Sequence, residues 1–114
     1  DRYEHVEQRD FSHLRYIMIC GCGFPNAKGN FEGVLQQWRL MFGSDALAIT
    51  VPEAHMFSAP EAAGVTGPFL ELVKQAGREY AESGTVTAET MEKLAVPMIP
   101  DEVYASIVNG GTGV

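Results

Sequence analysis

Two short apolar runs organise the first half of the chain. They cover residues 16–20 and 46–51, and both contain β-branched or aromatic side chains. Near-continuous apolar runs of this length are typical of strands that are buried on both faces of a sheet. Pro52 ends the second run, because proline lacks the backbone N–H that a strand ladder uses. The pattern therefore predicts two buried strands.

A helical pattern lies between these runs and predicts a helix over residues 31–42. Asn30 is the expected N-cap, and Gly43 the expected C-terminal stop. Apolar residues recur at helical spacing, and we expect Trp38 to pack in the core with the rest of this stripe: Phe31, Val34, Leu35, Met41 and Phe42. Two strands joined through a helix form a right-handed parallel βαβ unit. Residues 20–26 and 53–55 then share the carboxyl edge of the sheet.

The residue pattern of the second half of the chain predicts helices. Residues 58–67 are rich in Ala, Gly and Pro and predict a surface loop, after which Pro68 opens a helix that Gly84 ends. The inner face of that helix is expected to consist of Phe69, Leu72, Val73, Ala76 and Tyr80. Thr87 caps a shorter helix, another begins at residues 100–102, and the tail follows. The expected organisation is one domain over residues 1–114, with a lead-in (1–15), a βαβα core (16–81) and a helical tail (82–114).

Composition narrows the classes of function. The 114 residues are 46% apolar and carry a net charge of −7 with no basic cluster, so nucleic acid and anionic membranes are poor partners. No membrane span or signal peptide is visible, and a cytoplasmic location is expected. His5 and His13 have no partners at metal-ligand spacing, and the Cys20 and Cys22 pair alone is a poor zinc signal. We therefore expect no metal site.

Two strands do not make a self-sufficient sheet. The open edges invite either a missing amino-terminal half of the domain or a second copy of the chain, and we favour the first. The chain begins at Asp1 rather than at a methionine, which agrees with an upstream part.

The loop after the first strand carries the most chemical information. It reads Gly21, Cys22, Gly23, Phe24, Pro25 and Asn26, and glycine lets a backbone approach a flat or anionic ligand closely. The loop lacks a third glycine and a following Gly-Lys-Ser/Thr, so it matches no phosphate-binding fingerprint. Strand, Gly-rich loop and helix is nonetheless the unit that binds ligands at the carboxyl edge of open parallel sheets.

This order, continued by Phe31-Glu32 near the helix start, resembles the fourth strand, flavin loop and fourth helix of flavodoxin-like proteins. The run from Cys22 to Pro25 is more narrowly similar to the NAD(P)H-dependent FMN reductases. The resemblance implies an α/β, doubly wound parallel sheet, of which this chain is the carboxyl-terminal βαβα half with short tail helices. The Ser/Thr-rich phosphate loop of that family has no counterpart here.

The resemblance implies that residues 21–26 border the flavin ring of FMN and that NADH or NADPH is the reductant. The complete protein would be an oxidoreductase that passes hydride from nicotinamide to FMN and on to an acceptor. The cofactor performs that chemistry, so we assign no catalytic residue. We expect the isolated chain to be inactive. His55 and Glu53 lie at the right edge for substrate or flavin contact.

Two alternatives remain open at this point. One is a flavodoxin-like electron carrier that holds FMN without a nicotinamide substrate, and the other is a non-catalytic interaction module with an exposed sheet edge. The sequence leaves the electron acceptor, the choice of nicotinamide and the oligomeric state undetermined.

Overall fold

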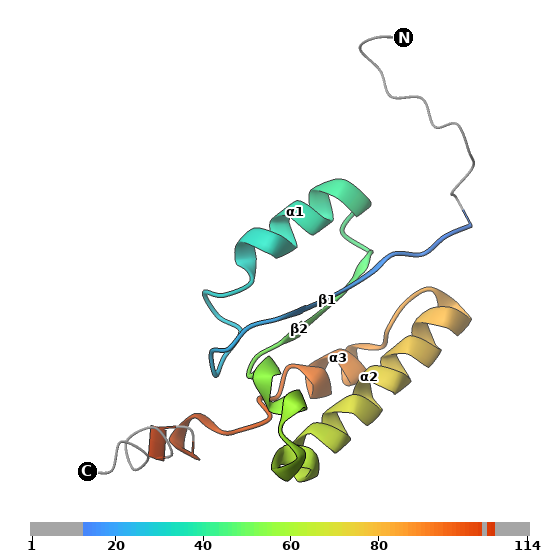
Figure 1. Cartoon of the computed structure of the whole chain (residues 1–114). Helices are drawn as coiled ribbons and strands as arrows, with labels where there is room; N and C mark the ends of the chain where they lie inside the picture. Colours follow the sequence, from blue (N-terminus) through green and yellow to red (C-terminus); the bar gives the residue numbers. More distant parts are fainter. Residues whose placement is uncertain (1–12, 104, 107–114) are drawn as a thin grey trace.

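The computed structural model describes residues 13–103, 105 and 106 (Figure 1). The chain has a mixed α/β fold in the element order β1 (Ile17–Gly21), α1 (Glu32–Phe42), β2 (Leu47–Val51), the 3₁₀ helices η1 (Ala54–Ser58) and η2 (Pro60–Ala62), α2 (Ala63–Ser83) and α3 (Ala88–Leu94). Residues 101–103, 105 and 106 are also helical, as predicted. The expected features at residues 1–12 and 107–114 lie outside the described residues.

The two strands pair in parallel, in register from Ile17 opposite Leu47 to Gly21 opposite Val51. This confirms the predicted parallel pair, with strand boundaries shifted by one residue. Helix α1 lies on one side of the pair, and α2 and α3 lie on the other (Figure 1). None of the helices in the described part of the chain is both long and apolar enough to cross a membrane.

The core lies between β2 and the helices α2 and α3. Leu47, Ile49 and Val51 point to this side of β2 and are all buried. They form one cluster with the helical residues Phe69, Ala76, Tyr80 and Leu94. The inner face of α2 and its end at Gly84 are as predicted. Burial of this cluster is the main source of stability, since apolar area removed from water drives folding.

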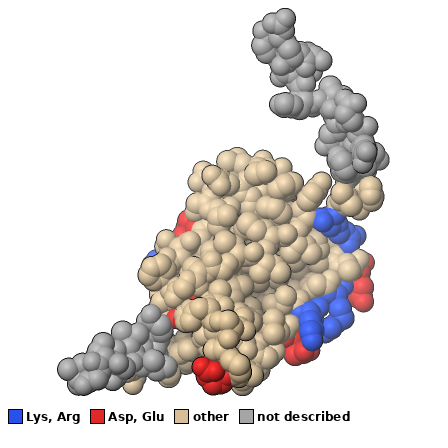
Figure 2. All heavy atoms as spheres, viewed as in Figure 1, with Lys and Arg blue, Asp and Glu red and all other residues tan. Residues whose placement is uncertain are grey.

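Strand β1 differs from the prediction that both strands are buried on both faces. Ile17 and Ile19 are 48% and 59% exposed, although their partners Leu47 and Ile49 are buried. Within the described residues no third strand pairs with the outer edge of β1. The core cluster contains no β1 residue, so the helical cover is centred on β2. The face of the molecule seen in Figure 2 is mainly uncharged, with charged side chains toward its margins.

Helix α1 is less deeply packed than its apolar stripe predicts. Met41 is 72% exposed, and no residue of the helix is fully buried. Trp38 is half-buried rather than core: its ring lies 4.5 Å from that of Phe42, and its Nε1 donates to the Ala46 carbonyl at 3.4 Å. The reason is that the sheet is small: two strands of five residues each cover only part of one face of the helix.

The predicted N-cap of α1 is wrong. Phe31 holds that position without a side-chain bond, and the Asn30 Nδ2 donates to the Asn26 carbonyl at 3.0 Å. Asparagine side chains often bond locally in turns, and this competing bond shifts the start of the helix.

The predicted loop at residues 58–67 is also wrong in part. It contains the second 3₁₀ helix and the first residues of α2, so Pro68 lies inside α2 instead of opening it. Proline costs a helix one N–H bond. Thr66 and Phe69 on either side of Pro68 are buried, and their packing outweighs that loss.

Helix α3 is tied to α2 through one carboxylate. Thr87 is the N-cap, as predicted, and accepts a hydrogen bond from the Thr90 N–H at 3.3 Å. The Glu79 carboxylate of α2 accepts from the Thr90 hydroxyl at 2.6 Å and from the Thr87 N–H at 2.8 Å. The Thr90 hydroxyl, followed by the Thr87 N–H, lowers the pKa of Glu79 from 4.5 to about 2.

Ile49 and Ile19 offer a matched test of the uneven core, because they are opposite each other in register. We expect Ile49→Ala to lower the free energy of unfolding by about 2–5 kcal/mol, since it leaves a cavity. Ile19→Ala should cost about 1 kcal/mol or less, because its side chain is already largely in water. Urea unfolding of both variants measures the difference. Equal costs would contradict the described burial.

Glu79→Gln tests the link between the helices. A carboxylate with a lowered pKa stabilises the fold above its unfolded pKa and loses that contribution as the pH falls through the folded pKa. The melting temperature of Glu79→Gln should therefore lie below that of the unmodified chain at neutral pH. The gap should close between about pH 4.5 and about pH 2. Thermal melts across this range, with exposed Glu71→Gln as control, measure it. A gap that does not depend on pH would contradict the assignment.

Candidate functional site

The carboxyl ends of both strands form one edge, and three backbone hydrogen bonds join the loops that follow them. The Cys22 N–H donates to the Val51 carbonyl at 3.1 Å, the Ala54 N–H to the Cys22 carbonyl at 2.9 Å, and the Glu53 N–H to the Phe24 carbonyl at 3.0 Å. The prediction that residues 20–26 and 53–55 share this edge is thus confirmed. The loop of residues 21–26 is held in place by its neighbour.

Two glycines of this loop have different roles. A Cβ on Gly21 would lie 2.6 Å from the Cβ of Ala54, a distance that real structures do not allow. Gly21 is therefore required for close approach of the two loops. A Cβ on Gly23 would have nothing within 4 Å, so this position is open on the outside. Gly23 leaves space beside the loop for a ligand.

The loop contains backbone donors that face no acceptor in the described part of the chain. Within the described residues, the N–H groups of Gly23, Phe24 and Asn26 make no hydrogen bond, whereas both backbone groups of Cys22 are used. Phe24 is 62% exposed, and Pro25 is half-buried. The Cys22 thiol is half-buried and donates weakly to the Phe24 carbonyl at 3.7 Å. A short row of free donors beside an exposed aromatic ring suits a flat ligand that carries carbonyl oxygens.

The start of α1, by contrast, is already occupied by a protein carboxylate. Glu32 accepts hydrogen bonds from the N–H groups of Gly29 at 2.8 Å and Phe31 at 3.2 Å. The Gly29 bond is the main cause that lowers the pKa of Glu32, so this carboxyl stays charged. A helix N-terminus binds phosphate through its first N–H groups. Gly29 and Phe31 precede the helix, but the carboxylate that they hold stands at its first turn, so a phosphate there would meet a negative charge.

Glu53 is the most unusual residue of the edge. Its backbone has a φ of 58°, in the left-handed region that disfavours side chains, and its side chain is only 3% exposed. One carboxylate oxygen lies 3.3 Å from His55 Nε2, while Oε1 is buried with no hydrogen-bond partner among the described residues. His55 itself is 64% exposed. This edge of the sheet therefore places a buried carboxylate beside an exposed imidazole.

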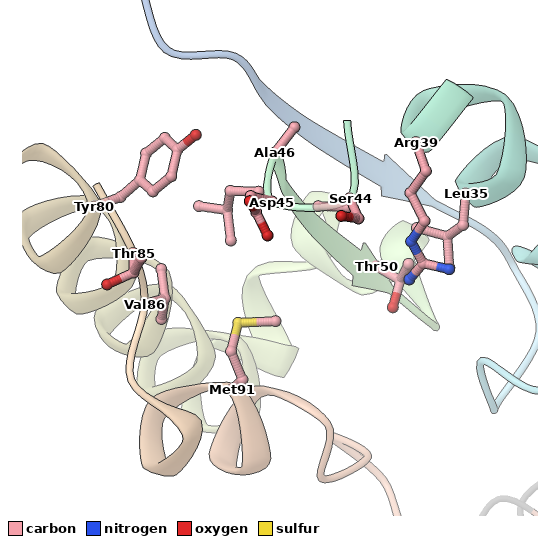
Figure 3. Close-up of a pocket in the computed structure, with 12 residues that line it drawn as sticks. Leu35, Arg39, Ser44, Asp45, Ala46, Thr50, Tyr80, Thr85, Val86 and Met91 are labelled. Carbon is pink, nitrogen blue, oxygen red and sulfur yellow. The ribbon is translucent and has the colours of Figure 1, made fainter. Parts of the chain in front are cut away.

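A separate, concave region lies along β2, and sequence reasoning missed it. It has a volume of about 450 Å³ and lies along the outer edge of β2 (Figure 3). Arg39 extends from α1 toward Thr50, and Met91 approaches from α3. The remaining lining comes from α1, the segment before β2, β2 itself and the end of α2: Leu35, Ser44, Asp45, Ala46, Leu47, Ala48, Tyr80, Thr85 and Val86. No local motif signals a groove built from so many separate segments.

Comparison with family models, curated proteins and solved structures gives no match to this chain. Its function must therefore be argued from the two regions described above.

The close approach at Gly21 gives a testable consequence. Gly21→Ala should lower the free energy of unfolding by about 1–3 kcal/mol, because the added methyl forces the loops apart. Gly23→Ala should change stability by less than about 0.5 kcal/mol, since its methyl meets nothing. The double variant Gly21→Ala with Ala54→Gly should recover much of the loss. Chemical denaturation measures all three, and a double variant as unstable as Gly21→Ala would contradict the contact.

Proposed function

We propose that this chain is the carboxyl-terminal half of a flavodoxin-like domain in an NAD(P)H-dependent FMN oxidoreductase. The observation that carries the proposal is the joined pair of loops at the carboxyl edge of a parallel strand pair. This is the edge at which open parallel sheets bind ligands. The free N–H groups of Gly23, Phe24 and Asn26 lie on the same loop.

The residues present fit the ring of a flavin. Its pyrimidine carbonyls need N–H donors, which the loop offers, and its flat face needs the open space beside Gly23. Phe24 is exposed and free to pack at the ring edge. When bound, FMN supplies the hydride chemistry, so the chain's own residues bind and orient. His55, held by Glu53, is an exposed polar side chain of this edge that can form a hydrogen bond to a ligand.

The residues present do not fit the FMN phosphate. The Glu32 carboxylate stands at the first turn of α1, held by the N–H groups of Gly29 and Phe31, and its charge repels an anion. We therefore infer that the phosphate site lies in the amino-terminal half of the domain. The exposed Ile17 and Ile19 support the same view, because they suit a further strand beside β1. An amino-terminal half of the domain would supply both a strand beside β1 and a phosphate loop. A second copy of this chain would supply only the strand.

Two titrations with FMN test the proposal. We expect the isolated chain to bind FMN weakly or not at all, because it lacks a phosphate site, and the complete protein to bind it with micromolar or tighter affinity. Flavin fluorescence during titration measures both. In the complete protein Gly23→Val should weaken binding by about tenfold or more, since its side chain fills the space beside the ring.

Gly33→Ala is the matched control, because a Cβ there also meets nothing but lies in α1. It should leave FMN affinity unchanged. NAD(P)H oxidation by the complete protein with FMN separates a reductase from an electron carrier. Micromolar binding by the isolated chain would show that the phosphate argument is wrong, and failure of the complete protein to bind FMN would overturn the proposal.

A further inference from the structure

The outer edge of β2 presents backbone groups that no described element uses. The Val51 carbonyl faces β1, where it accepts from Cys22. Successive residues of a strand direct their N–H and C=O groups to alternate edges, so Ile49 and Leu47 also face β1. Ala48 and Thr50 must then face outward, into the groove that they line. Within the described residues no loop or turn bonds to their backbone groups.

A second, smaller cavity adjoins the groove at Thr50. It has a volume of about 90 Å³, and Pro52 and Leu94, at the end of α3, also line it. Helix α1 forms one wall through Leu35 and Arg39, and α3 with the segment before it forms the other through Met91 and Val86 (Figure 3). An open strand edge thus lies at the bottom of an elongated groove with mixed polar and apolar walls.

We propose that this groove binds an extended peptide segment of a partner protein, which adds to the sheet as a strand beside β2. Addition of a strand to a sheet edge is a common mode of peptide recognition: backbone hydrogen bonds provide affinity, and side-chain contacts provide specificity. Here the N–H and C=O groups of Ala48 and Thr50 would bond to the peptide backbone. Leu35, Val86 and Met91 would contact its apolar side chains.

Two opposite charges define the chemistry of the peptide. Arg39 reaches toward Thr50, and Asp45 lies just before β2 begins. Neither side chain takes part in an ion pair among the described residues. The peptide should therefore carry an acidic residue near Thr50 and a basic residue near Asp45. At about 3.3 Å per residue, these two peptide residues should be about four to six positions apart.

A single strand fits this groove better than a second copy of the chain. In a second copy, β2 is flanked by that copy's own α1 and α2. These helices would clash with α1 and α3 of the first copy, which form the walls of the groove. A peptide strand has no such flanking helices. The inference does not depend on flavin binding, because it uses the edge of β2 that faces away from β1.

The test uses the full chain and a pool of capped synthetic peptides of about eight residues. Each peptide alternates Val and Thr and contains one Glu and one Lys about four to six positions apart, in either order. We expect the amides of Ala48 and Thr50 to gain protection from hydrogen exchange in NMR spectra when peptides are added. Backbone N-methylation of the tightest peptide should weaken binding by about tenfold or more, because it removes strand hydrogen bonds.

Two variants and a control locate the contact. Ala48→Pro removes an outward N–H without touching the β1 ladder, and it should abolish the peptide-dependent protection of Thr50. Arg39→Glu should weaken binding of the tightest-binding peptide by about tenfold, and a Glu-to-Lys change in that peptide should restore its affinity. Lys74→Glu, on the exposed face of α2, should have no effect.

Three results would overturn the proposal. The first is the absence of any protection at Ala48 and Thr50 from the whole pool while the spectrum shows a folded chain. The second is binding that survives N-methylation, which would indicate a small-molecule type of pocket. The third is dimerisation that blocks these amides without peptide, which would assign the edge to a second copy.

Discussion

The parallel pairing of β1 with β2 is the constraint on which the rest of the structure depends. It aligns the strands from Ile17 and Leu47 onward, and it requires α1 to cross between their ends. Because parallel strands need cover on both faces, α1 is placed on one side and α2 with α3 on the other. The cover is uneven: β2 has a buried face, and β1 does not. Two strands are therefore enough to place the loops but leave much of β1 in contact with water.

The same pairing determines where chemistry is possible. Both strands end at one edge, and the missing side chain of Gly21 lets the following loops approach closely enough to exchange backbone hydrogen bonds. Beyond Cys22, the N–H groups of Gly23, Phe24 and Asn26 have no hydrogen-bond partner among the described residues. Glu53 adopts a left-handed backbone conformation in the adjoining loop, and one of its carboxylate oxygens is buried without a hydrogen-bond partner among the described residues. Backbone strain of this kind clusters at functional sites, so Glu53 is a residue of this edge to test by mutation.

Much of the fold could be predicted from sequence because its signals are local. The two apolar runs, the stop at Gly43 and the cap at Thr87 each depend on a few adjacent residues, and the structure confirms them. The errors arise where tertiary packing decides. Pro68 signals a helix start, yet the buried Thr66 and Phe69 extend α2 past it. Ile19 has the same local pattern as Ile49 but a different neighbourhood. The groove beside β2 unites distant residues such as Arg39 and Met91, and no sequence spacing brings such a set together.

The two open edges of the sheet differ in a way that suggests different kinds of occupant. The side of β1 exposes Ile17 and Ile19, and a further cavity of about 270 Å³ beside Ile19 is lined by apolar residues of β1, β2, η1 and α2. Permanent interfaces resemble a divided protein core in this respect. The edge of β2 instead lies between walls that carry Arg39 and Asp45 as well as apolar side chains. Charged groups at a contact favour selective encounter more than tight binding. The β1 edge therefore suits a strand of the same domain, whereas the β2 edge suits a segment that binds and leaves.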